Sequence, residues 1–122
     1  MAFVHLHNHT EYSLLDGATK VYDMVKRAAD LGMPAVAITD HGVMSGVPEL
    51  ADACDKVKAE TGTWVKPIFG CEIYFTTDSS LKKEGKQKLH HMILLAKNNT
   101  GYHNIVKLVS ESHVDNFYYR PR

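Results

Sequence analysis

The sequence predicts an α/β fold with a mainly parallel sheet. Short apolar segments that fit β-strands alternate with longer segments whose apolar residues recur at helical spacing, and this alternation is typical of α/β proteins. The 122 residues are enough for one domain with a hydrophobic core. A content of 44% hydrophobic and 23% charged residues is ordinary for a globular protein.

The first half of the chain contains two predicted strands, at residues 3–6 and 35–39, and two predicted helices. The first helix has Thr19 as its N-cap and runs to about Leu31, with Gly32 as its stop. Its apolar stripe consists of Val21, Met24, Val25 and Ala28. The second helix covers residues 47–60, with Pro48 in its first turn and Gly62 past its end.

The second half contains two further strands, at residues 68–75 and 90–96, and a third helix at residues 102–112. Residues 76–88 between the two strands are polar and read as a loop. There is no internal repeat and no low-complexity segment, so we expect residues 1–122 to belong to a single domain.

Charge and cysteine content narrow the possible classes of protein. Fourteen basic and fourteen acidic residues cancel, so the chain lacks the net positive charge that would indicate nucleic-acid binding. Cys54 and Cys71 are isolated and lack CxxC spacing, which favours reduced thiols in a cytoplasmic protein. No signal peptide is evident, and no apolar stretch approaches the ~20 residues that span a membrane. We therefore expect a cytoplasmic location and no membrane partner.

Histidine and carboxylate side chains gather at the predicted strands and their ends. His7 and His9 continue the alternation of the first predicted strand, so on an extended backbone their side chains share a face, with α-carbons roughly 6.6 Å apart. The other candidates are Asp16, Asp40, His41, Glu72, His90 and His91. Imidazoles and carboxylates suit Zn²⁺, Mn²⁺ or Fe rather than Ca²⁺. Because ligands collect at the carboxyl ends of strands in α/β folds, the pattern predicts a metal site there.

Each of these residues alone has a simpler explanation. A single His on a strand is more often a hydrogen-bonded core residue, Asp40 could cap the following loop, and Glu72 could pair with a lysine. The coincidence of all of them on strands or at strand ends favours a metal site over a structural histidine core, although spacing alone does not place Glu72 and His91 at the carboxyl end. A lysine-rich segment at residues 82–88 could contact a DNA backbone, although a solvated loop is the simpler interpretation.

Five segments carry a family resemblance: FVHLHNHTEYSLLDGA, AITDHGVMSG, KPIFGCEIYF, HHMILLAKNNTGYHNIVKLVS and YYRPR. Together they resemble the PHP (polymerase and histidinol phosphatase) family, in the form found at the N-terminus of bacterial DNA polymerase III alpha subunits. The resemblance implies a distorted (β/α)₇ barrel, similar to a TIM barrel, of which residues 1–122 form the first part. It implies a set of metal ligands, namely His7, His9, Asp16, His41, Glu72 and His91. It also implies that Asp40 orients His41 and that His5 has a supporting role.

The resemblance further implies a metal-dependent phosphoesterase with Zn²⁺ or Mn²⁺ in a cluster of two or three ions. On a replicative, DNA-directed DNA polymerase its activity would be a proofreading 3′–5′ exonuclease. Its partners would be a DNA primer-template and other replicase subunits, and the Mg²⁺ of the polymerase site would lie in another domain. Two alternatives stay open: a non-catalytic module that docks a separate exonuclease subunit, and a free-standing phosphatase such as histidinol phosphatase.

The same resemblance places the family's remaining ligands after residue 122. We therefore expect the 122-residue chain by itself to be inactive. We also expect it to self-associate, because unpaired sheet edges can pair with another chain.

Overall fold

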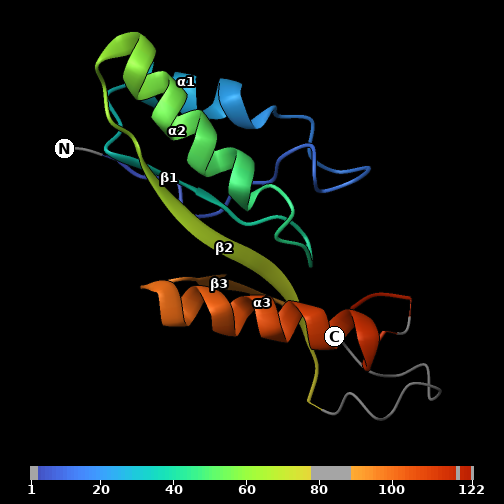
Figure 1. The fold of residues 1–122 in the computed structure, drawn as a ribbon. Helices are drawn as coiled ribbons and strands as arrows, with labels where there is room; N and C mark the ends of the chain where they lie inside the picture. Colours follow the sequence, from blue (N-terminus) through green and yellow to red (C-terminus); the bar gives the residue numbers. More distant parts are fainter. Residues whose placement is uncertain (1–2, 78–88, 118, 122) are drawn as a thin grey trace.

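The computed structural model describes residues 3–77, 89–117 and 119–121. Its elements in chain order are α1 (Val21–Asp30), β1 (Ala35–Ile38), α2 (Val47–Thr61), β2 (Lys66–Phe75), β3 (His90–Leu95) and α3 (Asn99–Val114). In Figure 1, α1 and α2 lie together near β1, the long strand β2 crosses the molecule, and α3 lies alongside β3. The lysine-rich residues 82–88 lie outside the described part of the chain. None of the described helices is long and apolar enough to cross a membrane.

The helix α1 begins one residue later than predicted, and its end follows the prediction. Lys20, with an extended backbone, is the N-cap in place of Thr19, and its side chain makes no capping hydrogen bond. The carbonyl of Thr19 instead accepts a hydrogen bond from the N–H of Glu11 at 3.0 Å, which ties Thr19 to the preceding loop. At the other end Gly32 has φ of +66°, a left-handed conformation that glycine adopts without strain, and its N–H bonds to the carbonyl of Ala29.

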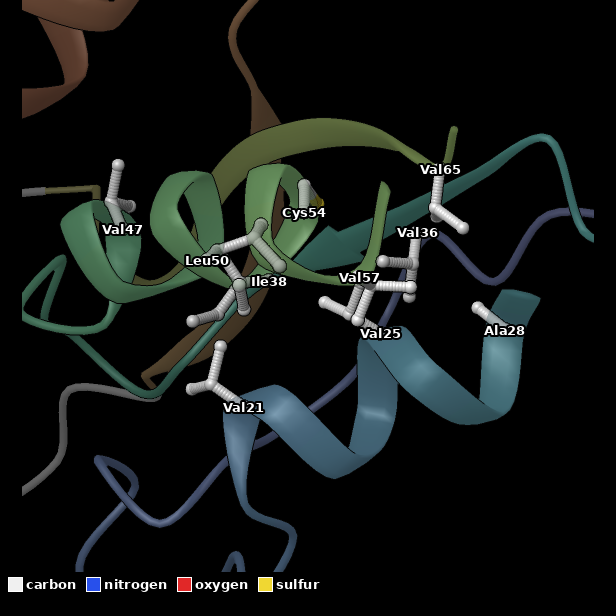
Figure 2. Packing of buried hydrophobic residues seen from close by; sticks show 11 residues of the cluster. Val21, Val25, Ala28, Val36, Ile38, Val47, Leu50, Cys54, Val57 and Val65 are labelled. Carbon is white, nitrogen blue, oxygen red and sulfur yellow. The ribbon is translucent and has the colours of Figure 1, made fainter. Parts of the chain in front are cut away.

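The hydrophobic core lies between α1, α2 and β1. Its members are Val21, Val25, Ala28, Val36, Ile38, Val47, Leu50, Ala53, Cys54, Val57 and Val65. Figure 2 shows side chains of the two helices pointing toward one another and toward β1. Burying each large aliphatic side chain contributes roughly 1.5–3 kcal/mol, so this cluster fixes both helices against the strand. The predicted stripe of α1 is confirmed, with Met24 partly buried at its border.

The sheet is mixed rather than mainly parallel. β1 and β2 pair in parallel, with Ala35 opposite Lys66 and Ile38 opposite Phe69. β3 pairs with β2 in the antiparallel direction, so the prediction of a mainly parallel sheet is wrong for this strand. A parallel return requires a crossover, usually a helix, whereas an antiparallel return needs only a loop. Residues 76–88 carry no apolar helical stripe in their sequence, in keeping with the antiparallel return.

Residues 3–10 run beside β1 without forming a regular strand, which corrects the strand predicted at residues 3–6. The N–H groups of Ala37 and Thr39 bond to the carbonyls of His5 and Asn8 at 3.1 and 3.0 Å. In a regular ladder, backbone N–H groups of residues 3–10 would also donate to carbonyls of β1. Here hydrogen bonds that involve side chains take their place. The N–H of Asn8 donates to Oγ1 of Thr39, and the Asn8 amide donates to the carbonyl of Ala37. The Asn8 side chain therefore occupies an acceptor that a strand backbone would use.

The helix α3 begins at Asn99, three residues before its predicted start at residue 102. Asn98 caps it, because its side-chain oxygen accepts a hydrogen bond from the N–H of Gly101 at 2.9 Å. Ile105 is buried, whereas Leu108 and Val114 are exposed. β3 lies at one edge of the described sheet, and the expected self-association of the chain stays a prediction.

Candidate metal centre

The six candidate ligands meet at one end of the sheet. They are His7 and His9 from the segment before α1, Asp16 from the turn that follows, His41 after β1, Glu72 in β2 and His91 in β3. His41 pairs with Glu72 in a parallel bridge beyond the end of β1. Because β3 is antiparallel to β2, its first residues lie beside the carboxyl end of β2. His91 is paired with Tyr74 and so becomes a diagonal neighbour of Glu72.

Glu72 lies at the centre of the cluster, and its side chain is 3% exposed. One carboxylate oxygen, Oε2, lies 2.6 Å from Nε2 of His7 and 3.0 Å from Nε2 of His9. The other oxygen, Oε1, lies 2.5 Å from Nδ1 of His91 and 3.5 Å from Nδ1 of His41. Each oxygen of this buried carboxylate therefore faces a pair of imidazoles.

Asp16 extends the cluster on the side of His41. Its Oδ2 lies 2.8 Å from Nε2 of His41, and the rings of His9 and His41 stack with centroids 4.1 Å apart. The possible ligand atoms form overlapping groups, within each of which they lie within 4.8 Å of one another: His7, His9 and Glu72; His9, Asp16 and His41; His41, Glu72 and His91. Because neighbouring groups share a residue, the arrangement can accommodate more than one ion.

The chemistry and spacing of these residues fit a transition-metal ion. Imidazole nitrogen and carboxylate oxygen are ligands of Zn²⁺ and Mn²⁺. Nε2 of His7 and Nε2 of His9 lie 3.0 Å apart, near the ~3.3 Å expected between two ligand atoms of a tetrahedral ion with bonds of about 2.0 Å. Nδ1 of His41 is buried and has no hydrogen-bond partner among the described residues. A cation between His41, Glu72 and His91 would give this nitrogen a partner.

A family model described as the PHP domain matches residues 5–122. The chain belongs to the PHP family. Its curated relatives include the DNA polymerase III subunit alpha of Helicobacter pylori, 45% identical over 121 residues, and that of Treponema pallidum, 40% identical over 125 residues. The subunit from Aquifex aeolicus is 42% identical over 128 residues. These matches cover 99%, 100% and 98% of the PHP chain but 10% of each relative, so the chain spans about a tenth of their length.

A solved structure is similar to the PHP chain over most of its length. This candidate metal-dependent phosphoesterase from Bifidobacterium adolescentis matches with a TM-score of 0.58 and 25% identity, over 92% of this chain and 34% of the other. The prediction of the PHP family is confirmed, and so is the α/β fold class, with a three-stranded sheet consistent with part of a barrel. The assignment of the six residues as metal ligands stays a prediction, as does the extent of the domain.

The surroundings shift the pKa values of two candidate ligands in the PHP chain. Burial by itself raises the pKa of the Glu72 carboxyl, but the hydrogen bond with His7 and the charges of His41, His9 and His7 outweigh it. The pKa of Glu72 therefore lies below its ordinary value. For His9, burial and the neighbouring His41 lower the pKa of the imidazole. An ionised carboxylate and a neutral imidazole are the forms that bind metal ions.

The carboxylate of Asp40 contacts Thr10 and Ser13, and the expectation that Asp40 orients His41 stays a prediction. Its carboxylate is buried and accepts hydrogen bonds from the N–H of Thr10 at 2.6 Å, from the Thr10 hydroxyl at 2.8 Å and from the Ser13 hydroxyl at 2.7 Å. Ser13 links Asp40 to the backbone of His41, because the N–H of His41 donates to the same Ser13 Oγ at 3.1 Å. The sequence alone does not single out Thr10 and Ser13. Hydroxyl residues are common in turns, and it is burial against Asp40 that distinguishes this pair.

His5 lies outside the three ligand groups, and its supporting role stays a prediction. Its ring packs edge-on against Phe3 with centroids 4.7 Å apart. His5 also lines a separate surface cavity of about 250 Å³ with Asp23, Met24 and Arg27. The prediction relied on strict alternation along a strand, and the irregular backbone of residues 3–10 does not keep that alternation.

Proposed function

We propose that this chain is the first part of the PHP domain of a DNA polymerase III alpha subunit, and that its cluster binds Zn²⁺ or Mn²⁺ for phosphoester hydrolysis. The observation that carries the proposal is Glu72, a buried carboxylate placed between two pairs of imidazoles. A structural histidine core would not require four imidazoles around one carboxylate. The similarity to DNA polymerase III alpha subunits and to a candidate metal-dependent phosphoesterase supports the same function.

The exposure of the ligands indicates the side from which a substrate would approach. The side chains of His9 and His41 are 22% and 23% exposed, and together with Glu72 they would hold a metal ion from the interior. The remaining ligands are about half exposed, namely His7, Asp16 and His91. Solvent and a phosphate group could therefore reach the outer side of the cluster. When bound, Zn²⁺ or Mn²⁺ supplies an acidified water and positive charge for the phosphate oxygens.

On a polymerase, the substrate would be the 3′ end of a primer strand, and the activity a proofreading 3′–5′ exonuclease. The chain has no net charge to attract DNA, so other domains of the parent polypeptide would hold most of the primer-template. Those domains would also contain the polymerase site with its Mg²⁺ and the contacts with other replicase subunits. This role implies a cytoplasmic location.

A second candidate function is a non-catalytic module that stabilises the polymerase and docks a separate exonuclease subunit. The cluster joins residues that are far apart in the sequence, from His7 to His91. An ion that binds the folded state and not the unfolded state stabilises the fold even without turnover. A free-standing phosphatase such as histidinol phosphatase agrees less well with relatives that are polymerase subunits.

Protein prepared without chelators should contain Zn²⁺ or Mn²⁺, and His7→Ala and His9→Ala should each lower the metal content. Both imidazoles lie within 3.0 Å of the Glu72 carboxylate, so each substitution removes a ligand from the same group. His103→Ala is the matched control, because His103 is exposed on α3 away from the cluster. Elemental analysis of folded protein measures the outcome. A metal content at background level in the unmodified chain would overturn the proposal.

Hydrolysis distinguishes the two candidate functions. The parent polypeptide and the 122-residue chain would be assayed on bis(p-nitrophenyl) phosphate and on a primer with a 3′ mismatch, with added Mn²⁺ or Zn²⁺. We expect chelator-sensitive turnover by the parent and little by the short chain, because an incomplete ligand set misplaces the reacting groups, at a cost of about 10²-fold in rate. A parent polypeptide that holds metal but hydrolyses neither substrate would favour the non-catalytic module.

A further inference from the structure

The hydroxyl of Ser13 lies at a junction of three polar groups. Ser13 is 2% exposed, and its Oγ lies 2.7 Å from Oδ1 of Asp40 and 3.1 Å from the backbone nitrogen of His41. The third neighbour, at 3.3 Å, is Nδ1 of His9. The other ring nitrogen of His9, Nε2, faces the cluster. Ser13 therefore contacts a candidate ligand on the side away from the metal centre.

The protons at this junction follow from the donor and acceptor capacity of each group. A hydroxyl has one proton to donate and two lone pairs to offer. An ionised carboxylate only accepts, so the proton of Ser13 goes to Asp40, at the shortest of the three distances. The backbone N–H of His41 only donates, and it occupies one lone pair of the hydroxyl. The lone pair that is left can accept only a proton carried on Nδ1 of His9.

We propose that Ser13, itself oriented by Asp40, is a positioning residue that keeps the proton of His9 on Nδ1 and directs the lone pair of Nε2 toward the cluster. Nε2 of His9 lies 3.0 Å from both Nε2 of His7 and Oε2 of Glu72, where a shared ion would be bound. Histidines that bind metals commonly donate their other N–H to a fixed acceptor, which sets the ring orientation and the tautomer. The inference rests on the proposed function, since it treats His9 as a ligand.

Asp40 is held in place by contacts that do not involve any ligand side chain. Thr10 donates to its carboxylate from both its backbone and its hydroxyl. The backbone carbonyl of Asp40 accepts the N–H of Glu72 at 3.0 Å. The residue that orients Ser13 is thus bonded to the strand that carries the central carboxylate. This arrangement fixes the ring of His9 relative to Glu72.

The tautomer of His9 can be measured without any substitution, by ¹⁵N NMR of the imidazole nitrogens in the metal-free 122-residue chain under conditions where the ring is neutral. We expect His9 to carry its proton on Nδ1, because Oε2 of Glu72, the competing acceptor at 3.0 Å on the Nε2 side, is already engaged by Nε2 of His7 at 2.6 Å. A predominant Nε2–H form would overturn the inference. Because this measurement requires no metal, it is independent of the proposed function, whose failure would appear as a chain that binds no Zn²⁺.

Ser13→Ala removes the acceptor of the His9 N–H with little change in volume. We expect the tautomer to shift toward Nε2–H and the affinity for Zn²⁺ to fall about 10- to 100-fold, measured by competition with a chromophoric chelator. Ser110→Ala is the matched control: Ser110 bonds to the carbonyl of Val106 within α3 at 2.8 Å, and its loss should change neither quantity.

Two outcomes of this substitution would contradict the inference. One is an unchanged tautomer together with an unchanged affinity. The other is a lower affinity with an unchanged tautomer, which would mean that Ser13 acts through the fold alone. If Ser13→Ala does not fold, the tautomer of the unmodified chain decides the question.

Discussion

Glu72→Gln is expected to remove the metal from this centre. The two oxygens of Glu72 face different pairs of imidazoles, with Oε2 beside His7 and His9 and Oε1 beside His41 and His91. A glutamine of nearly the same shape has no negative charge and presents an N–H₂ group to one of the two pairs. Losing a residue that merely supports a ligand lowers metal affinity about 10- to 100-fold. Since Glu72 belongs to two of the ligand groups, we expect a loss of at least about 100-fold.

Competition with a chromophoric chelator measures this affinity, and elemental analysis measures the metal retained after purification. Glu111→Gln is the matched control, because Glu111 is exposed on α3 and forms a surface pair with Lys107 at 3.9 Å. The control should retain the metal content of the unmodified chain. If Glu72→Gln also retained it, Glu72 would not be a ligand, and the proposed function would lose the observation that carries it.

The helices were the most predictable elements because their signals are local. Pro48 in the first turn of α2 and Gly62 past its end mark the helix within a residue, and Gly62 has φ of +74°. The fixed φ of Pro48 is compatible with the first turn of a helix, and Gly62, which lacks a side chain, adopts the left-handed conformation at its end. The start of α3 was missed because Asn98 acts as a cap through its hydrogen bond to Gly101, and asparagine is equally common in loops.

The direction of β3 and the path of residues 3–10 could not be read from the sequence. An apolar segment indicates a strand but not which way it runs, and here the antiparallel direction brings His91 beside Glu72. The prediction that His7 and His9 project together relied on a regular strand. The structure brings them together on an irregular backbone, at an Nε2–Nε2 distance of 3.0 Å. The supporting role of His5 rested on the same assumption, and in the structure its ring packs against Phe3.

The polar support of the site was also beyond the sequence pattern. Thr10, Ser13 and Asp40 are all nearly fully buried, and a buried polar group is costly unless it is hydrogen-bonded. The hydrogen bonds among these three residues therefore form only in the folded chain, where the turn of residues 10–17 meets the end of β1. Types of ligand can be predicted from composition and spacing, whereas the groups that orient ligands depend on packing.

Gly17→Ala is expected to destabilise this turn strongly. A Cβ on Gly17 would lie 2.0 Å from the carbonyl oxygen of Thr10 and 2.7 Å from its carbonyl carbon. These are backbone atoms, so no side-chain rotation can relieve the overlap. The N–H of Gly17 also bonds to the carbonyl of Ser13 at 2.9 Å, which holds the turn closed at this point. Overpacking usually costs about 1–3 kcal/mol, and a clash with backbone should reach about 3 kcal/mol or more.

Urea unfolding followed by circular dichroism measures the free energy of unfolding, and chelator competition on the same samples measures affinity for Zn²⁺. We expect both to fall, because opening the turn would separate Ser13 from Asp40 and Asp16 from His41. Gly101→Ala is the matched control. Its Cβ would meet Oδ1 of Asn98 at an ordinary 3.6 Å, and alanine within a helix is about 0.5–1 kcal/mol more favourable than glycine. Wild-type stability in Gly17→Ala would show that the turn can relax, and that the close approach of Gly17 to Thr10 does not hold the ligands in place.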